Sequence, residues 1–242
     1  PQRLGAASWL IEVVPAQDPF AERSRALVRR VRALPGVSVG GDSAGFVDQV
    51  ESIESHTPAA LALASAATLF VVFLMTGSVV LPVKQLLLNA MTVVATFGVL
   101  VWIFQHGRLH WLLDYEDWGA IVEPGALVLV AAIAFGLSTD YGIILLSRIR
   151  EARAHAGSEG AAIAAGLERT GRIVTAAALL FCAAVSGAAT SQIMTAKEVA
   201  LGMMLAVAID ATIVRSLLVP ALMAILGRWN WWAPTPLRRR RG

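Results

Sequence analysis

The chain has 242 residues, of which 57% are hydrophobic and only 15% are charged, and its mean hydropathy is +0.66. This composition excludes a disordered chain and does not suit a soluble globular protein. The net charge of +3 is too small to indicate a nucleic-acid-binding protein. The single cysteine, Cys182, excludes a disulfide within the chain and a metal site built from several thiolates.

The first 56 residues are more polar than the rest and mix extended with helical patterns. Residues 10–14 and 36–39 are predicted strands, and residues 19–34 between them are a predicted helix with arginines among its apolar positions. Residues 43–55 are a second helix candidate. Because this segment is too small for a core of its own, we interpret residues 1–56 as the C-terminal, α+β part of a larger extracytoplasmic domain.

The remainder of the chain carries five long apolar stretches. Each has about the 20 residues that a helix needs to cross a hydrocarbon core, and none shows the period-two alternation of barrel strands. They lie at approximately 58–81, 85–105, 124–147, 173–191 and 199–226. We therefore predict a mainly α, polytopic membrane helix bundle over residues 57–228, followed by a basic tail at 229–242.

Basic residues divide unequally between the two ends of these stretches. One side of the membrane has only Arg108 and Lys197 in its short loops. The opposite side has eleven basic residues: Lys84, Arg148, Arg150, Arg153, Arg169, Arg172, Arg228 and Arg238, Arg239, Arg240 and Arg241. The positive-inside rule predicts that the eleven lie in the cytoplasm, so that residues 1–56 are extracytoplasmic and the C-terminus is cytoplasmic.

Three ionisable residues lie within the apolar stretches: Asp140, Asp210 and Arg215. Inserting such a side chain costs about 2.5 to 3.5 kcal/mol, so each is expected to have a function or a partner. Arg215 follows Asp210 by five residues, roughly 140° around an α-helix, which predicts a bond from Arg215 to a neighbouring helix instead.

Small residues four positions apart precede both carboxyls, and such rows let another helix approach closely. This spacing predicts that both carboxyls point into the bundle. The rows are Ala132, Gly136 and Asp140 in one stretch and Gly202, Ala206 and Asp210 in another.

A carboxyl inside a membrane bundle can alternate between charged and neutral forms, as a proton carrier must. Asp140 is the strongest candidate, because the phenol of Tyr141 adjoins it and Ser138 and Thr139 add polar groups on nearby faces. The alternative is a structural role, in which an Asp–Arg pair fixes helix packing; for Asp210 and Arg215 both readings remain open.

No enzymatic pattern accompanies these residues. The four histidines lack a helical metal-binding spacing, and the chain has neither a phosphate-binding loop nor a nucleophile elbow. The sequence therefore predicts a protein that is not an enzyme, with no catalytic residue, no cofactor and no metal.

The segment Phe135-Gly-Leu-Ser-Thr-Asp-Tyr-Gly-Ile-Ile-Leu-Leu-Ser-Arg-Ile-Arg-Glu151 closely resembles the Asp-Tyr helix of the MMPL family, the mycobacterial-type large membrane proteins of the RND transporter superfamily. Residues 39–48, 77–98 and 209–234 resemble further parts of that family, in the right order. The resemblance covers nearly the whole chain. Many family members have Glu and Phe where this chain has Gly142 and Ile144.

The resemblance implies a twelve-span exporter made of two similar halves, of which this chain is the end of the second porter domain and the last five spans. It implies a proton relay at Asp140 and Tyr141, and export of lipids or other hydrophobic compounds across the cytoplasmic membrane, driven by the proton gradient. The implied partners are protons, membrane lipids, a lipid-like substrate and the missing N-terminal half, with a homo-oligomer left open. The alternative is an RND-fold receptor or scaffold that does not transport; an ion channel is less favoured, because no charged ring or filter loop is present.

Overall fold

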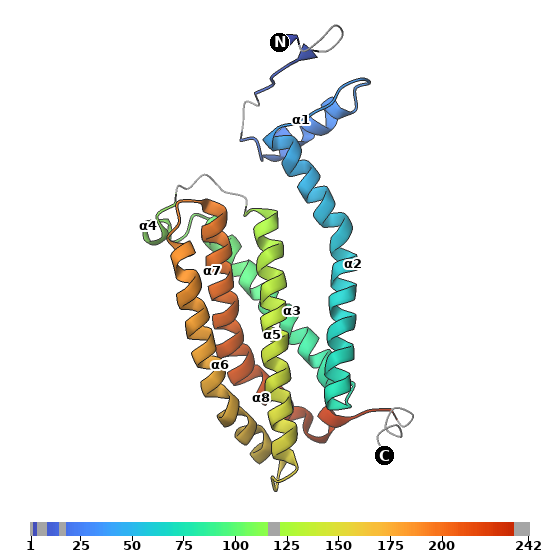
Figure 1. The fold of residues 1–242 in the computed structure, drawn as a ribbon, viewed down its shortest axis with the longest axis vertical. Helices are drawn as coiled ribbons and strands as arrows, with labels where there is room; N and C mark the ends of the chain where they lie inside the picture. The colour runs from blue at the N-terminus through green and yellow to red at the C-terminus, as the bar shows by residue number, and fades with distance from the viewer. Residues whose placement is uncertain (1, 4–8, 15–17, 116–121, 235–242) are drawn as a thin grey trace. The chain divides into compact units, whose positions relative to one another are not determined.

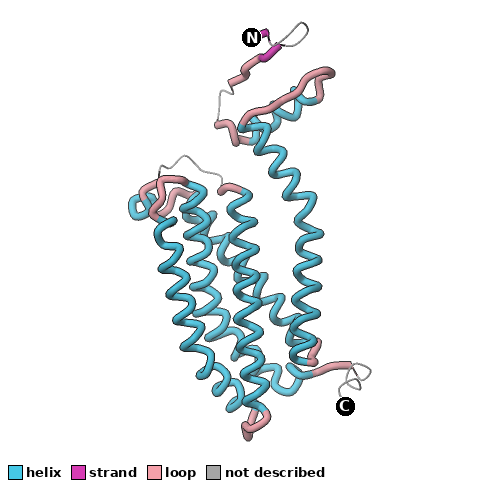
Figure 2. The backbone as a smooth tube through the Cα atoms, viewed as in Figure 1, coloured by secondary structure: helices cyan, strands magenta, loops and turns pink. Residues whose placement is uncertain are grey.

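Helices make up most of the computed structural model, which describes residues 2–3, 9–14, 18–115 and 122–234 (Figures 1 and 2). The chain divides at Pro58 into two compact units, residues 1–58 and 59–242. The tail arginines at 238–241 lie outside the described residues. The second unit confirms the predicted polytopic helix bundle.

Five helical segments are long and apolar enough to cross a membrane, as the sequence predicts. They are α2 (Asp42–Thr76), α3 (Val80–Phe104), α5 (Pro124–Arg153), α6 (Glu159–Ala189) and the continuous segment Met194–Trp231. That last segment comprises α7 (Met194–Ile209), the π-helix η1 (Asp210–Leu218), α8 (Val219–Leu226) and the 3₁₀ turn η2 (Gly227–Trp231). A short helix, α4 (His110–Leu113), lies between α3 and α5.

Four of the five segments begin earlier than the apolar stretches that predicted them, and two of them, α2 and α6, begin by far the earliest. The helix candidate at 43–55 and the first stretch form one helix, α2, which contains Pro58. Helix α6 begins at Glu159, because the Ser158 side chain accepts a hydrogen bond from the Ala161 amide at 3.2 Å and caps the helix. The helix therefore continues without a break from Glu159 into the predicted span.

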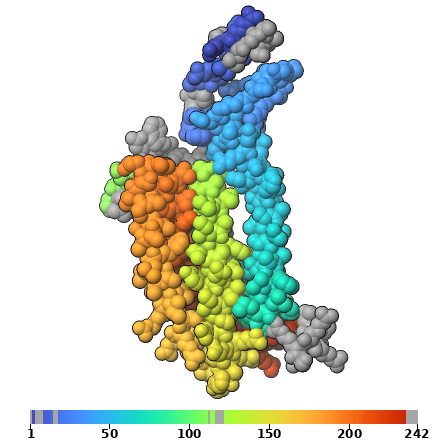
Figure 3. Space-filling model, in the orientation of Figure 1, coloured from blue at the N-terminus to red at the C-terminus, as the bar shows by residue number. Residues whose placement is uncertain are grey.

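Helix α5 is the centre of the bundle and packs against α3, α6 and α7. Figure 3 shows α5 and α6 side by side on one face. Glycines permit the close approaches: a Cβ added to Gly202 would lie 2.7 Å from Val130 Cγ2, and one added to Gly166 would collide with Ile149. Interfaces built on small residues are typical of helices that associate within a bilayer.

Buried polar contacts tie the helix ends together. Where α2 meets α3, the Ser78 hydroxyl donates to the Asn230 carbonyl at 2.5 Å, while the Asn230 amide donates to the Met223 and Gly227 carbonyls at 2.8 Å each. At the opposite end of the bundle, the Lys197 ammonium donates to two carbonyl oxygens near the end of α4. These bonds satisfy helix-terminal carbonyls that have no partner within their own helix.

The first unit contains less sheet than predicted. Strand β1 (Gln2–Arg3) pairs antiparallel with β2 (Trp9–Leu10), and neither 11–14 nor 36–39 forms a strand, so those two predictions are wrong at these positions. An extended segment becomes a strand only when a neighbour pairs with its backbone. Helix α1 (Glu22–Arg32) confirms the predicted helix, and Arg32 is bonded through both terminal nitrogens to Asp48.

Candidate functional site

Five buried polar side chains meet at mid-bundle where α3, α5 and η1 converge. Asn89 is fully buried, and Asp210 and Arg215 are only 6% and 4% exposed. Ser138 and Gln85 complete this polar cluster and are also buried. Because an unpaired buried charge is costly in hydrocarbon, the partners of each group decide what the cluster does.

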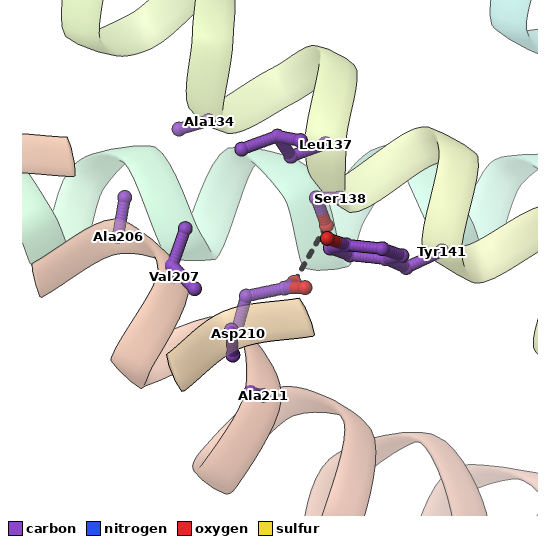
Figure 4. Close-up of a pocket in the computed structure, with 9 residues that line it drawn as sticks. Ala134, Leu137, Ser138, Tyr141, Ala206, Val207, Asp210 and Ala211 are labelled. Atoms are coloured by element: carbon purple, nitrogen blue, oxygen red, sulfur yellow. Dashed lines mark hydrogen bonds between the residues drawn. The ribbon is translucent and has the colours of Figure 1, made fainter. Parts of the chain in front are cut away.

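An ion pair forms the cluster's centre. Arg215 Nε donates to Asp210 Oδ2 at 2.5 Å, and Arg215 Nη2 donates to the Ser138 carbonyl of α5 at 2.5 Å. The Ser138 hydroxyl lies 2.6 Å from Asp210 Oδ1, to which it donates (Figure 4). The predicted bond from Arg215 to a neighbouring helix is therefore confirmed, whereas the prediction that Arg215 does not pair with Asp210 is wrong.

The π-helical geometry of η1 explains that error. Its backbone hydrogen bonds join residues five apart, so positions i and i+5 lie above one another, whereas the sequence argument assumed α-helical geometry. The Ser216 hydroxyl follows the same spacing and donates to the Ala211 carbonyl at 2.8 Å. Pro220 lies just after η1 and has no N–H to donate, which favours a local change from α-helical to π-helical hydrogen bonding.

Helix α3 contributes the amide half of the cluster. Gln85 Nε2 donates to Asn89 Oδ1 at 2.8 Å and to the Ser138 carbonyl at 3.2 Å, and Asn89 Nδ2 donates to Thr139 Oγ1 at 2.8 Å. Gln85 is a member of the cluster that was not predicted from the sequence. Its spacing of four residues from Asn89 places both amides on one helix face and was the available signal.

Tyr141 lies at the edge of the cluster. Its ring centroid is 5.1 Å from the Arg215 guanidinium carbon, within the range of a cation–π contact. Together with Ser138 and Asp210 it lines a small cavity between α5, α6 and α7 (Figure 4). Tyr141 therefore contacts the ion pair, a connection that its sequence position beside Asp140 did not indicate.

Asp140 lies outside the cluster. Its side chain is exposed, and it has no hydrogen bond or ion pair with any residue that the structure describes. The prediction that both carboxyls point into the bundle is confirmed for Asp210 and wrong for Asp140 within this chain. The other row of α5, with Ala134 and Ser138, is the one that is buried.

Metal ligands do not gather in the described part of the chain: no group of three or more His, Cys, Asp or Glu side chains could hold an ion there. The cluster instead holds fixed charges and hydrogen bonds in a low-dielectric setting. Such an arrangement can fix the position of helices and carry protons.

Comparison with known proteins matches residues 11–242 to the model of the MMPL family. The chain belongs to the MMPL family. It is 43% identical over 216 residues to the membrane protein SCO6666 of Streptomyces coelicolor, a match covering 88% of this chain and 30% of that protein. It is 39% identical over 203 residues to the trehalose monomycolate exporter MmpL3 of Mycobacterium tuberculosis, covering 84% and 21%.

A third relative, the heme uptake protein MmpL11 of Mycobacterium tuberculosis, is 36% identical over 214 residues, covering 87% of this chain and 22% of MmpL11. The chain thus spans between about a fifth and a third of the length of these curated relatives. The two mycobacterial relatives are named for different cargoes, so family membership alone does not specify a substrate.

Proposed function

We propose that the chain is the C-terminal part of an RND-type exporter, driven by the proton-motive force, that moves lipids or other hydrophobic compounds across the cytoplasmic membrane. Family membership and the similarity to the trehalose monomycolate exporter MmpL3 support the lipid cargo. The observation that carries the proton-driven mechanism is Asp140, an exposed carboxyl without a partner among the described residues, in the middle of an apolar helix.

Asp140 and Tyr141 form the proton relay in this proposal. Placing a carboxyl in a membrane span costs several kcal/mol, so such a group is expected to have a partner or a function. The described side chains of the polar cluster do not bond to Asp140, whose carboxyl is therefore available to bind and release a proton. The Asp210–Arg215 pair has a structural role instead and holds η1 against α5. Its bond to the Ser138 carbonyl fixes the backbone of α5 two residues before Asp140.

The upstream half of the protein completes the site. We propose that it covers the α5 row of Ala132, Gly136 and Asp140, where small side chains permit close helix packing. Residues 1–56 would then be the end of the second porter domain, residues 57–228 the last five spans, and residues 229–242 a cytoplasmic tail. The exposed apolar residues of the first unit, such as Trp9 and Ile11, support a role as part of a larger domain.

The decisive variant is Asp140→Asn in the full-length transporter. It keeps the side-chain shape but cannot ionise, so export into proteoliposomes driven by an imposed proton gradient is expected to stop, while expression and thermal stability remain. Tyr141→Phe is expected to reduce export less. Asp114→Asn is the matched control, because Asp114 is exposed outside the spans. A stable and fully active Asp140→Asn protein would remove the relay role.

Orientation is tested separately by cysteine labelling in a Cys182→Ala background. Gly157→Cys lies between α5 and α6 and is expected to react only with reagent on the cytoplasmic side, since most basic residues flank that end. His106→Cys lies at the opposite end and is expected to react only from outside. Labelling from the reverse sides would contradict the proposed topology.

A further inference from the structure

One nitrogen of the buried ion pair has no protein acceptor. Arg215 Nε and Nη2 have partners, but Nη1 is buried and no described protein atom accepts its hydrogen bonds. A buried donor without a partner costs about 1 to 3 kcal/mol, and more when it carries charge. Something outside the described protein atoms is therefore expected to accept from it.

A small cavity that Tyr141 does not line adjoins this arginine. Its volume is about 10 Å³, which is the space that one water molecule needs. Three polar residues, Gln85, Asp210 and Arg215, line it together with Gly142. The rest of its wall is apolar and consists of Leu145, Leu146, Val214 and Val219.

We propose that this cavity binds one ordered water, which accepts from Arg215 Nη1 and donates to Gln85 Oε1 and to the Asp210 carboxylate. Three hydrogen bonds are the usual number for a buried water. The Gln85 nitrogen already donates to Asn89 and Ser138, so its oxygen is the acceptor that remains. An anion is disfavoured, because the Asp210 carboxylate lines the same cavity and neutralises Arg215.

Gly142 makes this site possible. A Cβ at this position would lie 2.5 Å from Gln85 Oε1, so only glycine lets the Gln85 side chain lie against α5. The water then fixes the orientation of the Gln85 amide, and with it the two bonds that Gln85 donates. This assignment concerns a binding site for water and does not depend on whether the protein transports protons or lipids.

The test combines a high-resolution structure of the full-length transporter with X-ray hydroxyl-radical footprinting, which marks side chains beside bound water. We expect density within hydrogen-bond distance of both Arg215 Nη1 and Gln85 Oε1. We also expect Leu145 and Leu146 to be modified several-fold faster than Leu100, which is equally buried but lies away from this cavity. A map that resolves other buried waters but not this one would overturn the proposal, as would a protein group bonded to Nη1.

Two variants separate water binding from folding. Gly142→Ala displaces the Gln85 amide, and Gln85→Met removes the acceptor at similar length, so each is expected to lower the modification of Leu145 and Leu146 to the level of Leu100. Gly187→Ala on α6 is the matched control, because nothing lies within 4 Å of its added Cβ. Unchanged footprints in Gln85→Met, with the fold intact, would contradict the proposed acceptor.

Discussion

Two rows of residues on helix α5 differ in burial and in hydrogen bonding. The row of Ala134, Ser138 and Gly142 is buried against α3 and α7, and Ser138 bonds to the ion pair. The row of Gly136 and Asp140 is exposed, and Asp140 has no partner in the described part of the chain. The role of an intramembrane acid therefore depends on its partners: Asp210 is held in place by its ion pair, whereas Asp140 has a carboxyl that is available for chemistry.

Breaking the ion pair is expected to have the largest effect on stability. Arg215→Met leaves Asp210 buried without its partner and is expected to lower the free energy of unfolding by about 3 to 5 kcal/mol. Combining it with Asp210→Asn removes both charges and is expected to recover much of that loss. Unfolding of the full-length protein in mixed detergent measures both variants, and an equal loss in Asp140→Asn would abolish the distinction between the two rows.

Removing the Ser138 hydroxyl is expected to have an intermediate effect. Ser138→Ala deprives Asp210 of a donor in a buried site and is expected to cost about 1 to 3 kcal/mol in the same unfolding experiment. Ser147→Ala is the control on the same helix, because the Ser147 hydroxyl is exposed and donates to the Ile144 carbonyl of its own helix. An equal loss of unfolding free energy in the two variants would show that the buried Ser138 hydroxyl stabilises the protein no more than the exposed Ser147 hydroxyl does.

The aromatic contact to the ion pair is expected to have the smallest effect. Tyr141→Leu removes the ring beside the Arg215 guanidinium and is expected to cost about 0.5 to 2 kcal/mol. Tyr141→Phe keeps the ring and is expected to stay within about 0.5 kcal/mol of the native protein. Because the second variant removes only the hydroxyl, an export defect in Tyr141→Phe without a stability loss would assign the phenol to proton handling.

Sequence patterns predicted what is periodic and missed what depends on neighbours. Apolar length predicted the five spans, and spacing predicted the burial of Asp210. Spacing also identified a row containing Asp140, but a row of small residues does not say which helix covers it, and Gly136 and Asp140 stay exposed among the residues that the structure describes. The π-helical ladder at Asp210 was missed because a fixed angle per residue cannot register a local change in helix type.

The π-helix η1 also makes the final span tolerant of a one-residue deletion at this place. Deleting one residue between Asp210 and Arg215 would restore α-helical spacing, in which an acid and a base four positions apart still face each other. The ion pair would survive such a deletion, and because the widened π-helical turn accommodates the extra residue, the residues after Arg215 would stay close to their present positions. A deletion in the α-helical part of the span would instead rotate every later residue by about 100° and shift it by about 1.5 Å. Asn230 would keep its bonds to the Met223 and Gly227 carbonyls, and the Ser78 hydroxyl would keep its bond to the Asn230 carbonyl, so η1 is the part of this span that can lose a residue without disturbing the end of the bundle.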